Sequence, residues 1–299
     1  MDQLPIGELA AVATAVLWTF SAVAWTSAGR YVGALAVSFV RLLITCVFLL
    51  LHGQLVLGQA LPLDASGHAW TVLGLSGFLG FFVSDLCLFK ALLILGPRLS
   101  LLIYSLTPPM TAILARLFLD EQLAAVQWLA MGITLGGVAW VVCEQPDDDE
   151  ARHTRRTAHG VVLAVLGAAW QAVAVILSKA GLGDCDPAAA TFIRVLGGMA
   201  GYLVLVTLLG RWPAMLATLR QPRLMAILSG GALVGPYLGV TLYLVALRRC
   251  PAGVVATIVA TMPVLILPFA IVLYREKVSL RAVFGAVLSV VGVALLMSP

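Results

Sequence analysis

The chain has 299 residues, of which 62% are hydrophobic and only 11% are charged. Its mean hydropathy of +1.06 excludes a soluble globular protein, whose interior could not hold so much apolar surface. The net charge of +4 is typical of a membrane protein with arginine in its loops and does not indicate a nucleic-acid partner. Five cysteines, an odd number, give neither a disulfide framework nor a metal-ligand spacing.

Ten apolar runs follow one another along the chain. Each is about 20 residues long, the length at which a helix spans the hydrocarbon core of a bilayer. They cover approximately residues 6–28, 33–51, 69–95, 97–119, 123–142, 160–181, 187–209, 224–247, 251–274 and 279–298. The first run follows acidic residues and is too long for a cleaved signal peptide. The sequence therefore predicts an all-α integral membrane protein with ten transmembrane helices, leaving no room for a soluble domain.

Charged residues lie inside two of the early runs. Charge within a membrane helix is costly and by default indicates a polar cavity, so Asp85 and Lys90 in the run 69–95 are candidates for binding a substrate. Their separation of five residues puts them on different helix faces, so they are not expected to pair. Lys90 is close enough to the helix end to reach the interface instead. Arg41, in a Phe-x-Arg motif, is predicted to be a structural anchor that reaches the interface in the same way.

The run 97–119 is interrupted at its centre by Pro108, and Glu121 follows before the run 123–142. Proline removes a helix hydrogen bond and clashes with the preceding turn, so it predicts a kink. The kink is either a static feature of packing or a hinge that flexes. Glu121 is expected in the first turn of the next helix, where a carboxylate favours the helix dipole, with proton coupling as the alternative role.

The second half of the chain repeats the first. An offset of 155 residues places 246–297 on 91–142 without a gap. The matches fall at landmarks, with Pro108 on Pro263, Glu121 on Glu276, and Gly137-Val138-Ala139 on Gly292-Val293-Ala294. Earlier features also recur, with Trp18 matched by Trp170, Arg41 by Arg194, and Gly80 by Gly235. The sequence therefore predicts a five-helix repeat over 1–143, a polar linker over 144–159 and a second five-helix repeat over 160–299.

Five spans per repeat is an odd number, so the second repeat enters the membrane from the opposite face. The two repeats are then inverted relative to each other, an arrangement typical of secondary transporters with a substrate site near the midplane. Hinges are expected at the matched positions Gly80, Pro108, Gly235 and Pro263. Arg41, Glu121, Arg194 and Glu276 are expected to be structural charges.

Several aromatic residues lie mid-span, although tryptophan and tyrosine prefer the membrane interfaces. They are Trp18, Phe82, Tyr104, Trp170, Tyr237 and Tyr243. Mid-span aromatics need a polar partner or a wet cavity, so they are candidates for substrate binding, with ordinary helix packing as the alternative. The glycine pairs Gly132/Gly136 and Gly197/Gly201 predict close helix packing, with a dimer interface as the alternative to a monomer.

The mid-helix prolines, the acid at the following hinge and the glycine-rich next helix resemble the EamA domain, two copies of which make a ten-helix drug/metabolite transporter. The paired Phe-x-Arg motifs are also similar to the family. Family hinges often read Gly-Glu, whereas this chain has Asp120-Glu121 and Arg275-Glu276. Within the family the chain looks most like the YddG-type exporters, through overall similarity. The resemblance implies export of amino acids, aromatic ones favoured, across the cell inner membrane by alternating access.

No catalytic motif, paired intramembrane aspartates or phosphate-binding loop competes with this interpretation. The sequence thus predicts a carrier rather than an enzyme, with no metal, cofactor or ATP, and with a small molecule and membrane lipid as its partners. An exporter of organic cations or drugs is the runner-up, and a membrane enzyme or scaffold is the third possibility. Eleven Lys and Arg residues in the odd-numbered connections against four elsewhere outside the membrane predict that both termini lie outside.

Overall fold

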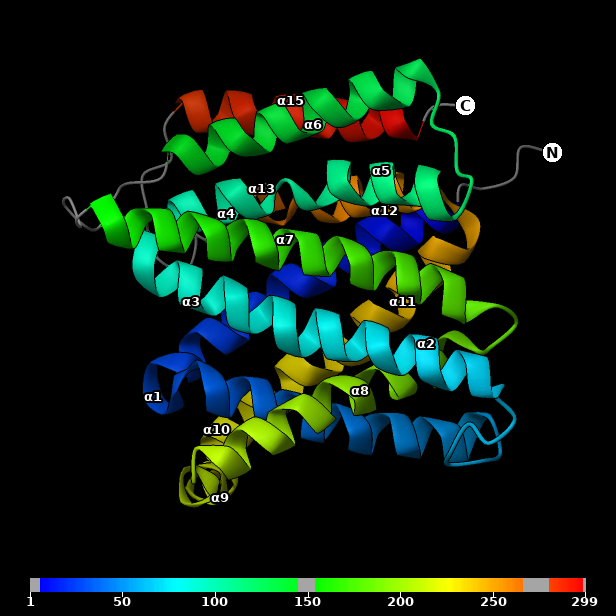
Figure 1. Cartoon of the computed structure of the whole chain (residues 1–299), viewed down its shortest axis with the longest axis vertical. Coiled ribbons are helices and arrows are strands. Elements are labelled where there is room, and N and C mark those ends of the chain that lie inside the picture. The colour runs from blue at the N-terminus through cyan, green and yellow to red at the C-terminus, as the bar shows by residue number, and fades with distance from the viewer. Residues whose placement is uncertain (1–5, 145–153, 266–279, 298–299) are drawn as a thin grey trace.

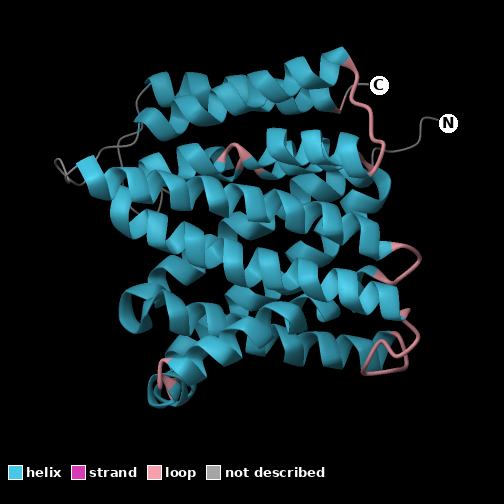
Figure 2. Cartoon of the chain, viewed as in Figure 1, coloured by secondary structure: helices cyan, strands magenta, loops and turns pink. Residues whose placement is uncertain are grey.

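The computed structural model of the chain describes residues 6–144, 154–265 and 280–297, and every regular element in them is a helix (Figure 2). Helix α1 (Ile6–Val56) turns back at Gly33, so it crosses the bundle twice (Figure 1). The φ of Gly33 is 78°, a left-handed conformation that glycine adopts without steric cost. The two apolar runs predicted at 6–28 and 33–51 are therefore joined by one residue and not by a loop.

The rest of the first repeat contains three further spans. The first is continuous and consists of α2 (Gly67–Gly77), a π-helical stretch η1 (Phe78–Ser84) and α3 (Asp85–Leu95). The second is broken and consists of α4 (Pro97–Tyr104) and α5 (Thr107–Phe118). The third is α6 (Ala125–Glu144). The predicted proline kink is thus a complete break, because two consecutive prolines in the first turn of α5 supply no N–H groups to the preceding turn.

The second repeat has the same order of elements. Its first spans are α7 (Thr154–Leu182) and α8 (Pro187–Leu208), followed by a short helix α9 (Trp212–Leu219) that was not predicted. A continuous span follows, made of α10 (Pro222–Ala232), the π-helical η2 (Leu233–Gly239) and α11 (Val240–Arg249). The last described elements are α12 (Ala252–Val259), α13 (Met262–Leu265) and α15 (Leu280–Leu296).

Element boundaries in the two repeats correspond at the offset of 155 residues found in the sequence. The π-helical stretches start at 78 and 233, and the broken spans are interrupted after residues 104 and 259. The described residues contain seven helices long and apolar enough to cross a membrane and two shorter apolar helices, Ala252–Leu265 and Leu280–Leu296. With α1 counted as two spans, these make ten transmembrane segments in two inverted five-helix repeats, as predicted. Apolar side chains also cover the outer surface, as expected for helices that face lipid.

Helices α6 and α15 pack against each other at one side of the bundle (Figure 1). Gly137 makes this contact, because a Cβ there would meet the backbone of Gly285 and Ser289. Gly132 and Gly136, which were predicted to pack closely, have open space where a Cβ would lie. The predicted packing of Gly197 and Gly201 is present instead, against α2 and against a ring of η1.

The start of α1 and the end of α15 lie at the same end of the bundle, on the right in Figure 1. This end also carries the connections 57–66, 119–124, 183–186 and 250–251, and it is called the termini face below. Ten crossings return the chain to its starting side, so this arrangement follows from the even number of spans. Which side of the membrane the termini face occupies stays a prediction.

Candidate functional site

A cavity of 490 Å³ lies between the two repeats at the level of the helix breaks. The breaks contribute Tyr104, Ser105, Thr107 and Pro108 from the first repeat, and Val259, Ala260, Met262 and Pro263 from the second. Helices α1, α7 and α11 add Trp18, Gln171 and Tyr243. Discontinuous helices at the interface of inverted repeats are where membrane carriers form their substrate sites.

Aromatic rings give the cavity an apolar wall. The rings of Trp18 and Tyr243 stack, with centroids 5.6 Å apart and planes inclined by 29°. The Trp18 indole N–H donates a hydrogen bond to the carbonyl of Gly235 at 3.3 Å, so its polar group is satisfied by the protein. Such ring faces bind aromatic or other planar apolar groups by offset stacking.

The hydroxyl groups around the cavity are arranged as acceptors. Thr19 donates its proton to a carbonyl of α1 at 2.8 Å, and Ser105 donates to the carbonyl of Leu102 in α4 at 2.6 Å. Thr107, at the start of α5, donates across the break to the carbonyl of Tyr104 at 2.7 Å. Ser84 donates to a carbonyl of α7 at 2.9 Å, so the Tyr104 hydroxyl, 3.2 Å away, donates to Ser84. Because these protons are used, the oxygens offer lone pairs and favour a ligand with N–H or O–H donors.

Two polar groups of the lining, the Gln171 amide on α7 and the Tyr243 hydroxyl on α11, make no hydrogen bond to a described residue. A Cβ on Gly80 would lie 3.4 Å from Oε1 of Gln171, so glycine at that position leaves room for the amide. An amide offers both a donor and an acceptor, and an unpartnered polar group in a membrane helix is by default functional. Sequence reasoning missed Gln171, although it was a lone amide in the apolar run 160–181.

Three of the predicted substrate-binding residues meet in the cavity, namely Trp18, Tyr104 and Tyr243, together with the predicted hinges Pro108 and Pro263. Four others lie outside the described lining. Phe82 packs edge-on against a ring of α8, and Lys90 is exposed. Trp170 is 37% exposed on the outer surface, and the Tyr237 hydroxyl lies 2.8 Å from Nδ1 of His52.

Asp85 also lies outside the cavity lining, and it forms an ion pair with Arg41. The two side chains are largely buried, with 20% of Asp85 and 9% of Arg41 exposed. The Arg41 guanidinium also lies 4.4 Å from the ring centroid of Trp25. The structure therefore pairs Asp85, which was predicted to bind a substrate, with a charge of the protein itself. It anchors Arg41 through this buried partner instead of at the interface.

Arg194 is 2% exposed and lacks a carboxylate partner among the described residues. Its Nε donates to Ser76 Oγ at 3.0 Å, and its guanidinium lies 5.1 Å from the ring centroid of Phe81. A hydroxyl and an aromatic face thus replace the carboxylate that Arg41 has. Both arginines lie within the helix packing, consistent with a structural role.

The predicted hinge glycines lie within the π-helical stretches, Gly80 in η1 and Gly235 in η2. A Cβ on Gly80 would lie 3.1 Å from the Cβ of Ala174, and one on Gly235 would lie 2.8 Å from a ring carbon of Trp25. Both glycines therefore allow close approach of a neighbouring helix. π-Helical turns are common at functional sites, and the hinge role stays a prediction.

Glu121 caps a different helix from the one predicted, α12 instead of α6. It precedes α6 by four residues and accepts a hydrogen bond from the N–H of Ala252, the first residue of α12, at 2.7 Å. A carboxylate at that position also favours the dipole of α12. Its repeat counterpart Glu276 lies outside the described residues.

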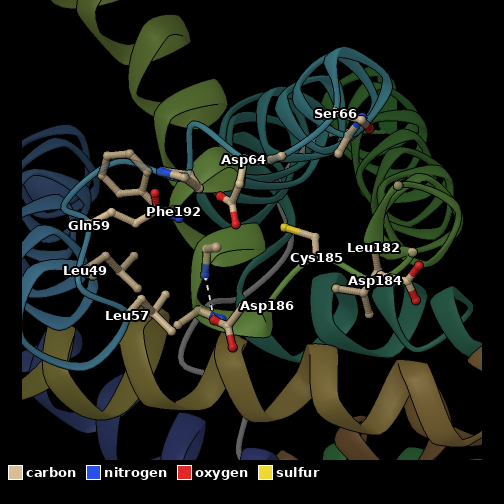
Figure 3. A pocket seen from close by; sticks show the side chains of 18 of the residues that line it. Leu49, Leu57, Gln59, Asp64, Ser66, Leu182, Asp184, Cys185, Asp186 and Phe192 are labelled. Carbon is tan, nitrogen blue, oxygen red and sulfur yellow. Dashed lines mark hydrogen bonds between the residues drawn. The ribbon is translucent and has the colours of Figure 1, made fainter.

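A second pocket of 470 Å³ opens at the termini face, between the connection after α1 and the connection before α8 (Figure 3). Asp64, Asp184 and Asp186 line it, and all three are exposed. Asp186 caps α8 by accepting hydrogen bonds from the N–H groups of its first turn at 2.8 and 3.1 Å. Among the described residues, no three His, Cys, Asp or Glu side chains are grouped as metal ligands.

Comparison with known proteins identifies the family. One solved structure, described only as the crystal structure of a protein, is similar to 97% of this chain over 95% of its own, with a TM-score of 0.75 and 17% identity, which supports the fold alone. No curated protein matches significantly. The sequence pattern of the EamA-like transporter family matches residues 5–143 and 158–298. The chain therefore belongs to the EamA-like transporter family, whose members are multi-pass membrane transporters.

Proposed function

We propose that the protein is a secondary transporter that exports amino acids or related small metabolites, aromatic amino acids favoured, across the cell inner membrane. The observation that carries this proposal is the cavity between the inverted repeats, where stacked aromatic rings adjoin hydroxyl acceptors. Phosphate-binding loops are absent from the sequence, so the energy comes from gradients of substrate or ions.

The cavity fits the parts of an aromatic amino acid one by one. The side chain stacks on the Trp18 and Tyr243 rings. The ammonium donates to hydroxyl oxygens such as those of Thr107 and Tyr104, whose own protons are used elsewhere. The carboxylate accepts from the N–H groups of Gln171.

Transport proceeds by alternating access around this fixed site. The two broken spans place short half-helices on either side of the cavity level, α4 and α12 before the breaks and α5 and α13 after them. A break removes the helix hydrogen bonds that would keep the halves collinear, so each half can tilt separately. Pro108 and Pro263 then serve as the hinges.

The runner-up substrate, an organic cation or drug, would be recognised best by an unpaired carboxylate. No Asp or Glu is among the described lining residues, and Asp85 is paired with Arg41. The amino-acid assignment is therefore the one that the described cavity favours.

The experiment is counterflow of radiolabelled tryptophan into proteoliposomes containing the purified protein. Saturable uptake is expected, and Gln171→Leu should weaken apparent affinity by about tenfold, because one or two hydrogen bonds to a charged group are lost. Gln221→Leu, which alters a glutamine in the connection between α9 and α10, is the matched control. Absence of saturable flux for every aromatic amino acid would refute the substrate class, and flux of organic cations instead would support the runner-up.

A further inference from the structure

A polar contact between the two repeats closes the termini face. Glu121, in the connection between α5 and α6, accepts the hydrogen bond from Ala252 N–H at 2.7 Å. The same carboxylate lies 2.5 Å from Nζ of Lys179 on α7, and this Nζ also donates to the carbonyl of Cys250 at 2.5 Å. One residue of the first repeat thus holds two segments of the second.

The contact is largely shielded from solvent, and the residue before Glu121 has a left-handed backbone conformation. The Glu121 side chain is 14% exposed and the Lys179 side chain 21%, so salt and water screen the pair less than a surface pair. Asp120, directly before Glu121, has a φ of 53°. This left-handed conformation favours glycine, and aspartate is among the few other residues that tolerate it.

A layer of tightly packed helix separates this contact from the cavity. Every residue of α12 is buried, and a Cβ on Gly253 would lie 2.6 Å from the Cβ of Ala112 on α5. Ala115, Leu247 and Val255 belong to the same core and are at most 1% exposed. Separation of α5 and α12 would therefore open a route between the cavity and the termini face.

The equivalent contact is not available in the other repeat. The offset of 155 residues places Pro97 at the position of Ala252, and proline has no N–H to donate. The alignment of Trp18 with Trp170 places Ser27 at the position of Lys179, so the cation is missing as well. The sequence therefore lacks the Ala252 N–H and the Lys179 cation at the repeat-related positions, and among the described residues this charged contact is found at the termini face.

We propose that Glu121 and Lys179 form a gate that holds the termini face closed and that opens when Glu121 leaves Lys179 and Ala252. The role of the gate in transport rests on the proposed carrier function. The contact and its opening can be measured on the protein without substrate. Removal of either partner should raise the population in which α5 and α12 are apart.

Cys250 provides the reporter for this opening. Its side chain is 5% exposed and its Sγ packs against the start of α1 at Gly7. Burial and the neighbouring Glu8 carboxylate raise the pKa of its thiol to about 12, so it reacts slowly in the closed structure. The protein is prepared with Cys46 and Cys250 as its only cysteines, and labelling by N-ethylmaleimide in detergent is followed by mass spectrometry. Lys179→Met and Glu121→Gln should each accelerate Cys250 labelling by about tenfold. Arg116→Met removes an exposed charge at the same face and should leave the rate within about twofold.

Cys46, half-buried in the second half of α1, reports unfolding of the whole protein. Equal acceleration at Cys46 and Cys250, or a Cys250 rate no higher than in Arg116→Met, would overturn the gate. The double variant Glu121→Gln/Lys179→Met should label more slowly than the product of the two single accelerations, because both changes remove the shared Glu121–Lys179 contact, and a fully multiplicative acceleration would also overturn the gate. Labelling needs no substrate, so failure of the transport assay and failure of the gate are separate results.

Discussion

The two repeats bury an arginine at matching positions and compensate it differently. Arg41 has a carboxylate partner in Asp85 and lies over the Trp25 ring. Among the described residues, Arg194 has the Ser76 hydroxyl and the face of Phe81 instead. Each guanidinium leaves one buried nitrogen without a hydrogen-bond partner there, Nε in Arg41 and Nη1 in Arg194. The sequence explains the difference, because Val240 occupies the repeat position of Asp85.

The comparison shows that the duplicated fold preserves the positions of buried charges without preserving their electrostatics. A guanidinium in a low-dielectric interior needs hydrogen bonds or an opposite charge to offset its lost hydration. The first repeat supplies an opposite charge and the second supplies weaker polar and aromatic contacts. The two arginines should therefore respond very differently to loss of a neighbour.

The largest effect is expected for Asp85→Asn, which leaves Arg41 buried without an opposite charge. The free energy of unfolding should fall by about 3 kcal/mol, measured by denaturant titration in mixed micelles. Asp64→Asn, at an exposed position, is the control and should have almost no effect. The double variant Arg41→Met/Asp85→Asn should recover much of the loss, and a purely additive double variant would show that the two residues are not coupled.

A smaller effect is expected for Ser76→Ala, which removes the acceptor for Arg194 Nε. Stability should fall by about 1–2 kcal/mol, because a buried charged donor loses its partner. Thr71→Ala, at an exposed site on α2, is the comparison in the same assay. If Ser76→Ala were as costly as Asp85→Asn, the proposed difference between the repeats would disappear.

The smallest effect is expected for Phe81→Leu, which removes the aromatic face beneath Arg194. Loss of the cation–π interaction should cost about 1 kcal/mol in the unfolding experiment. Phe284→Leu, a ring 58% exposed on α15 and not paired with a cation, is the control for the change in size. Equal costs for the two variants would mean that Phe81 contributes by packing alone.

Much of the fold can be predicted from the sequence, because the sequence features that specify it act locally. Apolar length predicts each span, and the 155-residue offset predicts the correspondence of the breaks after Tyr104 and Val259. The absence of the family glycine at the first hinge is also meaningful, because Asp120 adopts the positive φ that glycine would adopt readily. The effects of a glycine, a proline or a long apolar run depend mainly on neighbouring residues in the chain, so the sequence alone predicts them.

The candidate site was only partly predictable, because its membership depends on how helices rotate against one another. Trp18, Tyr104 and Tyr243 face the cavity, whereas Trp170 faces outward although it matches Trp18 in the repeat. Gln171, one residue later on α7, takes the inward position. A helix places adjacent residues about 100° apart, so an alignment of repeats shifted by one residue changes which side chain faces the cavity.

The sequence by itself determined a ten-span membrane protein with two inverted repeats, because spanning length and repetition are properties of the chain alone. The tertiary structure decided the partners of its buried charges. Asp85 meets Arg41 across 44 residues, and Glu121 meets Ala252 across 131. Hydropathy shows that a charge lies in the membrane but not which group lies next to it. In a medium without water, that neighbouring group determines whether the charge stabilises the fold, binds a substrate or closes a gate.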